Sequence, residues 1–167
     1  MFILSFLFFV TVVFTLFISC EDPEPEQTGY IPLVPQDTFP ELGHDGPYFE
    51  DSIYFGRNEY IEYHSGSLPI ILSSAHGGWN EPTEIPDRTE GTTVTDINTY
   101  QLTKVIIDTL MARFGGKPHA ILCLLERMKL DVNQDSENAA EGNVYAERAW
   151  GEYHHYLDVA KEIVTMN

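Results

Sequence analysis

The sequence predicts an α/β fold in which helices pack on a largely parallel or mixed sheet. Two short apolar runs, at residues 68–74 and 120–125, have the length and composition of buried strands. Apolar residues at three- and four-residue steps occur between these runs and again near the end of the chain, a spacing typical of amphipathic helices. Strands that alternate with helices favour a layered structure in which a helical crossover joins the two apolar strands.

The amino-terminal segment is unlike the rest of the chain. Residues 1–19 carry no charge and consist mainly of Phe, Leu, Ile and Val, and acidic residues and prolines follow Cys20 at once. This arrangement resembles a bacterial lipoprotein signal in which Cys20 carries the lipid. An uncleaved anchor helix is the alternative, because about twenty apolar residues can span a bilayer. Both interpretations attach the protein to a membrane of the cell envelope, outside the cytoplasm.

The chain then divides into a tether and a domain. Residues 20–58 hold most of the prolines, with scattered acids and no sustained period, so we expect an acidic tether and an irregular lead-in. The domain is expected over residues 59–167, beginning with a short strand at 59–64 and a turn before the apolar run at 68–74. A sheet of about three strands with two helices buries little apolar surface. We therefore expect this domain to be the amino-terminal part of a longer, truncated one.

Two helices are expected in this domain. A long loop, residues 75–95, precedes the first helix, for which Thr95 is a suitable N-cap and Gly115 and Gly116 are the stop signal. The second helix ends the chain. One face of it carries the apolar residues Ala146, Ala149, Trp150, Tyr153, Leu157, Ala160 and Val164.

The charge balance excludes one class of partner. The chain has 26 acidic and nine basic residues and a formal net charge of −17. Such a charge repels a phosphate backbone, and no basic stripe offsets it, so nucleic acid is not expected to bind. Cys123 lies in an apolar run and, once Cys20 is lipidated, has no disulfide partner, so it is interpreted as a small core residue.

Polar residues follow both apolar strands, at the edge where ligands bind in open α/β sheets. His76 comes directly after the first strand, and Gly77 and Gly78 leave room for a metal or a substrate to approach the backbone. A turn histidine in a glycine-rich loop is the alternative. After the second strand, Arg127, Lys129, Asp131 and Asn133 alternate with apolar residues. In an extended chain these four side chains would point to the same side. They would then form either the wall of a pocket or the solvent-exposed face of a half-buried strand.

Five segments in order resemble the N-formylglutamate amidohydrolase family. They cover roughly residues 60–165, and several motifs in one order are more specific than any single motif. The segments are 69–78 (PIILSSAHGG), 85–88 (IPDR), 95–96 (TD), 127–133 (RMKLDVN) and 149–154 (AWGEYH).

The resemblance implies a hydrolase fold, of phosphorylase/hydrolase-like type, similar to zinc carboxypeptidases and aspartoacylases, and a bound zinc ion. His76 matches the first zinc ligand. Glu81 is the first choice for the acidic ligand because of its short spacing from His76, and Asp96 is the next. The family's later histidine has no match here, and a catalytic carboxylate is also expected from outside this chain. Zinc with three protein ligands keeps one position open for the water that attacks an amide.

The resemblance also implies a substrate-binding segment. In related enzymes an Asp-x-Asn-Arg segment holds the carboxylate of the substrate, whereas this chain has Asp131, Val132, Asn133 and Gln134. Gln134 carries no charge, which weakens binding of a glutamate-like anion. Arg88 or Arg127 would then compensate, or the substrate differs.

The sequence favours two possible functions. The first is a zinc-dependent amidohydrolase that acts outside the cytoplasm on a small N-acyl amino acid or a peptide-like amide. The second is a surface-binding lipoprotein that retains the fold without catalysis, which Gln134 and the unmatched ligand would permit.

Overall fold

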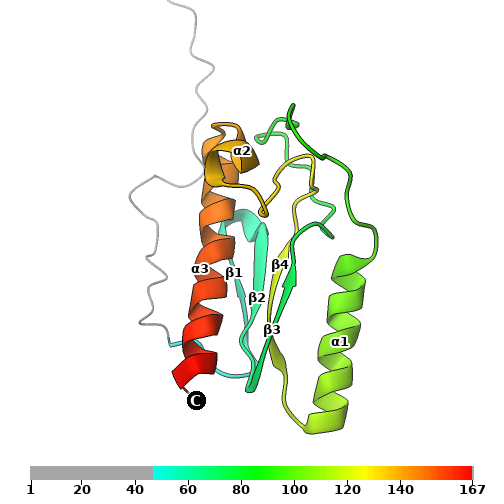
Figure 1. Ribbon diagram of the computed structural model, residues 1–167, viewed down its shortest axis with the longest axis vertical. Coiled ribbons are helices and arrows are strands. Elements are labelled where there is room, and N and C mark those ends of the chain that lie inside the picture. Colours follow the sequence, from blue (N-terminus) through cyan, green and yellow to red (C-terminus); the bar gives the residue numbers. More distant parts are fainter. Residues whose placement is uncertain (1–46, 167) are drawn as a thin grey trace, which may run out of the picture. The chain divides into compact units, whose positions relative to one another are not determined.

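The computed structural model describes residues 47–166, which form a mixed sheet between helices (Figure 1). The sheet has four strands in the order β1-β2-β4-β3. In chain order the elements are β1 (Ile53–Phe55), η2 (Arg57–Glu59), β2 (Ile61–His64), β3 (Leu68–Ser74), α1 (Thr99–Phe114), β4 (Pro118–Cys123), α2 (Ser136–Ala140) and α3 (Val144–Met166).

The α/β fold class is confirmed, and the sheet is mixed. β3 and β4 are parallel neighbours joined through α1, as the alternation of strands and helices predicts. β1 and β2 add two antiparallel pairings on the other side of β4. β4 is therefore an inner strand and is buried along its whole length. The apolar run at residues 120–125 begins inside β4 and passes its end, so the strand starts and stops two residues earlier than predicted, and burial explains why its residues 120–123 are all apolar.

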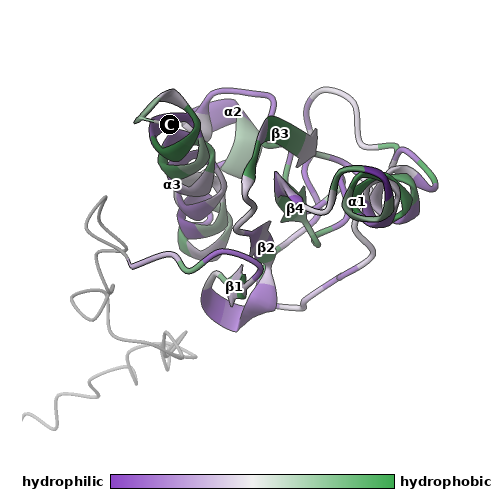
Figure 2. Ribbon diagram, turned by 90° about the horizontal axis from the view of Figure 1, so that it is seen from below, coloured by the Kyte–Doolittle hydropathy of each residue, from purple (hydrophilic) through white to green (hydrophobic). Residues whose placement is uncertain are grey.

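Helices cover the two faces of the sheet unequally. Seen along the strands, α3 lies on one side of the sheet and α1 on the other (Figure 2). α3 packs against β2, β3 and β4, whereas α1 packs mainly against β3 and β4. The face of β1 that points away from α3 is left partly open, and Ile53 and Phe55 are each 48% exposed there.

Several predicted boundaries require correction. The sheet begins with β1, inside the segment expected to be an irregular lead-in. Thr95 is not the N-cap of the first helix: Asn98 precedes that helix, and the hydroxyl of Thr95 accepts a hydrogen bond from the backbone N–H of Arg127. The stop at Gly115 is correct, because its left-handed backbone (φ 73°) ends α1.

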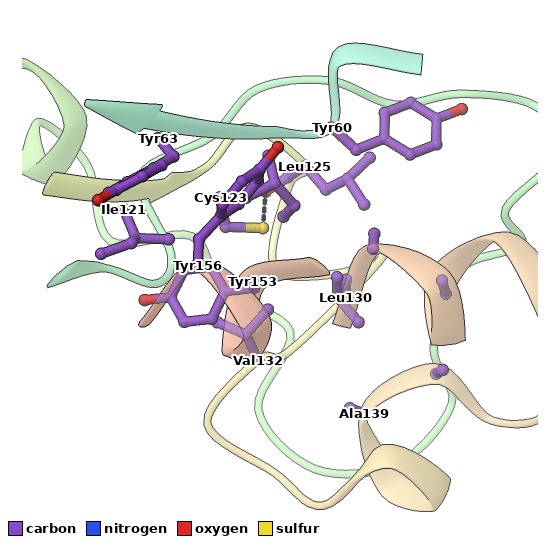
Figure 3. Close-up of a cluster of buried hydrophobic side chains, with 14 of the residues drawn as sticks. Tyr60, Tyr63, Ile121, Cys123, Leu125, Leu130, Val132, Ala139, Tyr153 and Tyr156 are labelled. Carbon is purple, nitrogen blue, oxygen red and sulfur yellow. Dashed lines mark hydrogen bonds between the residues drawn. The ribbon is translucent and has the colours of Figure 1, made fainter. Parts of the chain in front are cut away.

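The larger core lies between the sheet and α3. The rings of Tyr63 and Tyr156 stack with their centroids 5.0 Å apart, and Tyr153, Ile121 and Cys123 surround them (Figure 3). Cys123 is a buried core residue, as predicted, and burial raises the pKa of its thiol to about 12. A thiol with such a pKa is not a nucleophile at neutral pH.

Gly78 is required where the loop after β3 crosses the chain that leaves β4. A Cβ atom at Gly78 would lie 2.2 Å from the carbonyl carbon of Leu124. We expect Gly78→Ala to lower the free energy of unfolding by about 1–3 kcal/mol, since two backbone segments must separate. Gly151→Ala is the control, because a Cβ there meets nothing within 4 Å and alanine favours the helix. Urea titration measures both; equal stability of the two variants would contradict the close approach.

The amino-terminal predictions lie outside the described residues. They concern residues 1–19, the lipidated Cys20 and the tether that follows. Among residues 47–166, no helix is both long enough and apolar enough to span a bilayer.

Candidate functional site

The candidate site lies where the carboxyl ends of β3 and β4 meet. The loops that follow these strands gather at the same end of the sheet as α2 and the start of α1 (Figure 1). His76 and Asp131, which are 55 residues apart in the sequence, come into direct contact there, as expected for polar residues that follow parallel neighbours. A cavity of about 250 Å³ lies at the opposite end of β3, lined by Leu68, Pro69 and His119 among others.

Both ring nitrogens of His76 face carboxylates. Nε2 lies 2.7 Å from Oδ1 of Asp131, and Nδ1 lies 3.3 Å from Oδ2 of Asp96. The imidazole ring is buried, whereas 53% of the Asp96 side chain is exposed. A neutral imidazole donates from one nitrogen only. In the tautomer that donates from Nε2 to Asp131, the nitrogen that faces Asp96 carries no hydrogen and can bind a metal ion.

Asp131 is the centre of the site's hydrogen-bond network. Its Oδ1 also accepts from the backbone N–H of Asn133 at 3.1 Å. Its Oδ2 accepts from Nε of Arg127 at 3.1 Å and pairs with Nη2 of Arg127 at 3.0 Å. Burial raises the pKa of Asp131, but the hydrogen bonds from His76, Asn133 and Arg127 outweigh this effect and lower the pKa below its usual value. Asp131 is thus an ionised carboxylate that holds His76 and Arg127 in place.

The two arginines proposed for substrate binding are both engaged within the protein. The buried guanidinium of Arg88 donates to the carbonyl oxygens of Glu90, Thr92 and Arg127, at 3.0 to 3.2 Å. The guanidinium of Arg88 therefore holds its own loop in place through these hydrogen bonds and does not face solvent. Arg127 is 17% exposed and lies between Asp131 and Asp96. Nη1 of Arg127 is 3.9 Å from Oδ1 of Asp96.

The segment after β4 is not extended, so the expected alternation of its side chains is wrong. The backbone N–H groups of Lys129 and Leu130 both donate to the carbonyl of Glu126, which forms a turn. Arg127 and Asp131 meet across this turn as an i,i+4 pair. Lys129 points away from this pair. Its Nζ donates to the carbonyl of Ile85 at 2.8 Å and pairs with the carboxylate of Asp87.

Asn133 and Gln134 are both exposed. The contacts that place them are made by the backbone. The N–H of Asn133 donates to Asp131, and the carbonyl of Gln134 accepts from Nε1 of Trp150 at 2.9 Å. These bonds fix the backbone of the loop and leave both side chains at the surface of the protein.

The predicted acidic ligands differ in their position. Asp96 contacts His76, and its backbone N–H donates to the carbonyl of His76 at 3.0 Å. Glu81 is exposed, and no hydrogen bond or ion pair joins it to His76. Within residues 47–166, no group of three or more His, Cys, Asp or Glu side chains is arranged to hold a metal ion. The structure therefore favours Asp96 over Glu81 as the partner of His76.

The other described histidines have partners away from this site. The ring of His64 contacts Glu62, and Nδ1 of His119 lies 2.9 Å from the hydroxyl of Tyr63. Nε2 of His154 lies 3.0 Å from the carbonyl of Val132. These contacts hold the three rings away from His76.

Glu141 shapes the site, although no sequence signal pointed to it. Its carboxylate accepts from the backbone N–H groups of Thr89 and Glu90, at 2.8 to 3.0 Å. These bonds lower the pKa of Glu141. Together with the guanidinium of Arg88, they hold the loop at residues 88–92 beside the turn that carries Asp131.

A second polar cluster, also missed from the sequence, ties α1 to β2. Oε1 of the buried Glu62 accepts from Nζ of Lys104 at 2.8 Å and contacts His64, and Oε2 accepts from the hydroxyl of Tyr100 at 3.2 Å. Burial raises the pKa of Glu62, but His64 and Lys104 outweigh this effect and lower the pKa to about 2. This cluster fixes the first turns of α1.

Comparison of the chain with protein-family models, curated proteins and solved structures found no match.

Proposed function

We propose that this chain carries part of the site of a zinc-dependent amidohydrolase of the N-formylglutamate amidohydrolase type. In this proposal His76 and Asp96 are zinc ligands, Asp131 orients His76, and the substrate is a small N-acyl or peptide-like amide. The tether and Cys20 would keep the domain at the outer side of a membrane in the cell envelope.

The separation of His76 and Asp96 is the observation that carries this proposal. Nδ1 of His76 and Oδ2 of Asp96 are 3.3 Å apart. Two ligands bound tetrahedrally to zinc, each about 2.0–2.1 Å from the metal, lie about 3.3 Å apart. A zinc ion therefore fits between these atoms without a large movement of either side chain.

The position of Asp131 supports the same assignment. Its carboxylate lies at Nε2, the ring nitrogen away from Asp96. A histidine that binds a metal through one nitrogen almost always donates a hydrogen bond from the other, often to a carboxylate. That bond fixes the tautomer and leaves Nδ1 free to bind zinc. Asp131 is accordingly proposed as a positioning residue, in place of the substrate-binding role expected from the sequence.

The proposed chemistry assigns a separate task to each residue of the site. Bound zinc lowers the pKa of a coordinated water and polarises the amide carbonyl. His76 and Asp96 would hold the metal, and Arg127 would keep Asp131 ionised beside His76. The proposal requires at least one further protein ligand and a general base from outside residues 47–166.

Zinc content and amide hydrolysis together test this proposal. The complete protein, with the segment that supplies the further ligand and the general base, is purified in detergent and equilibrated with zinc. It is expected to retain one zinc per chain and to hydrolyse an N-acyl amino acid amide, whereas the present chain with two ligands alone is expected to bind zinc weakly. We expect His76→Ala to abolish stoichiometric zinc binding and hydrolysis. Asp131→Asn should weaken zinc binding by about 10- to 100-fold, since it removes a bond to a ligand rather than the ligand itself. Unchanged zinc content in His76→Ala would refute the assignment.

A binding lipoprotein without catalysis is the second candidate. It is favoured by the neutral Gln134, which stands where the related enzymes have an arginine that holds the carboxylate of the substrate. The same experiment separates the two functions, because this candidate predicts no amide hydrolysis even when zinc is bound.

A further inference from the structure

We infer that the site selects an uncharged amide with an apolar acyl group, and that Trp79 is the residue that recognises this group. The inference rests on the proposed function, because the amide is the substrate of that same site. Four observations carry it: the fixed position of Trp79, the support beneath its ring, the exposed apolar residues beside Asp96, and the charges of the site.

Trp79 is held close to His76 by its backbone. It follows His76 by three residues, and its N–H donates to the carbonyl of Leu124 at 2.9 Å. The N–H of Asn80 donates to the same carbonyl at 2.8 Å, and Asn80 pairs with Leu125 as a parallel bridge. The loop is thus anchored to the chain that leaves β4, yet the side chain of Trp79 is 53% exposed.

The ring of Trp79 rests on a rigid support. Its centroid lies 4.8 Å from that of Tyr100, with the planes at 90°, an edge-to-face contact. The hydroxyl of Tyr100 donates to Glu62, which Lys104 also holds. The backbone of Tyr100 packs closely on Gly77. A Cβ atom added at Gly77 would lie 2.4 Å from the backbone nitrogen of Tyr100. The ring is therefore fixed beside the loop that carries His76.

Further apolar side chains lie next to Asp96. Val94 is 73% exposed and Ile97 is 82% exposed, and the backbone N–H of Asp96 between them donates to the carbonyl of His76. A single exposed apolar side chain is common on a protein surface. Trp79, Val94 and Ile97 each lie within three positions of His76 or Asp96 in the sequence, and we infer that an apolar group of the substrate covers them.

The charges of the site disfavour an anionic substrate. Both arginines of the site, Arg88 and Arg127, bond to groups of the protein itself. The residue at position 134 is a neutral glutamine, and the chain has a net charge of −17. A carboxylate would meet repulsion here without a free cation of the site to pair with. An uncharged amide with an apolar acyl group fits both the exposed apolar side chains and the charges.

Calorimetric titration of two uncharged amides tests this inference. N-hexanoyl-alaninamide and N-acetyl-alaninamide differ only in the apolar part of the acyl group. The zinc-equilibrated complete protein is expected to bind the hexanoyl amide about tenfold more tightly, since part of the added chain is buried on Trp79. Trp79→Ala should remove this preference. Trp79→Phe should retain part of it, because the benzyl ring still offers an apolar surface.

Phe114→Ala is the matched control, because Phe114 is an aromatic residue that is 63% exposed at the other end of α1. It should bind both amides as the unaltered protein does. Equal affinity of the unaltered protein for the two amides, or an unchanged preference in Trp79→Ala, would overturn the inference. Hydrolysis of the same amides is measured separately. Hydrolysis without a preference refutes only this inference, and a preference in binding without hydrolysis refutes only the proposed catalysis.

Discussion

Replacing Asp131 with alanine should lower the free energy of unfolding of the metal-free protein by about 3–5 kcal/mol. The carboxylate is fully buried and accepts hydrogen bonds from His76, Arg127 and the backbone of Asn133. Removing one partner of a buried charge pair lowers the free energy of unfolding by about this amount, because the remaining charge stays buried with neither its partner nor water to stabilise it. Arg127, at 17% exposure, would be left facing an apolar methyl group.

Urea titration of Asp131→Ala and Asp96→Ala measures this effect with an internal control. Asp96 faces the other nitrogen of the same histidine, but its side chain is 53% exposed. An exposed pair contributes about 0–1 kcal/mol, so Asp96→Ala should be nearly as stable as the unaltered protein. Similar losses in the two variants would show that Asp131 is not the centre of the network.

Glu152→Gln should stabilise the protein above neutral pH. Glu152 is 3% exposed, and burial raises the pKa of its carboxyl to about 7, against the lowering effects of the Arg57 backbone N–H and of the Arg57 and Arg148 charges. The folded protein therefore favours the neutral carboxyl, whereas in the unfolded chain the pKa of this carboxyl lies near its usual value of 4.5. The stabilising contribution of the neutral form is fully present below about pH 4.5 and is lost as the pH rises through about 7.

The expected size of this effect is about 3 kcal/mol between pH 4.5 and pH 8, from the difference between the two pKa values. Thermal unfolding across this range should show a loss of stability in the unaltered protein that is absent from Glu152→Gln. Glu147→Gln, at an exposed position of the same helix, should keep the pH dependence of the unaltered protein. A pH profile that is the same in all three proteins would contradict the raised pKa.

Local sequence patterns predicted much of the sheet and both long helices. The apolar run at residues 68–74 coincides with β3, but the prediction that this strand is buried was wrong: β3 lies at the edge of the sheet, and only Ser74 is buried. The glycines after Phe114 mark the end of α1. β1 was missed because it has three residues and lies at a sheet edge, where half-exposed side chains give no continuous apolar run.

The candidate site was predicted less completely. The position of His76 after an apolar strand identified it, and parallel pairing explains why residues after β4 approach it. The shared direction of the four polar side chains after β4 was predicted wrongly, because alternation assumes an extended chain and the carbonyl of Glu126 closes a turn there. That turn brings Arg127 to Asp131 and sends Lys129 away from the site.

By itself, the sequence determined the α/β class, the buried core position of Cys123 and the placement of His76 at the end of a strand. These features depend on periodicity and composition over a few neighbouring residues. Only the tertiary structure decided that β1 and β2 pair antiparallel, that Asp131 holds His76, and that Asp96 rather than Glu81 lies beside it. Such contacts join residues far apart in the chain, and they form only when the sheet and its loops have packed together.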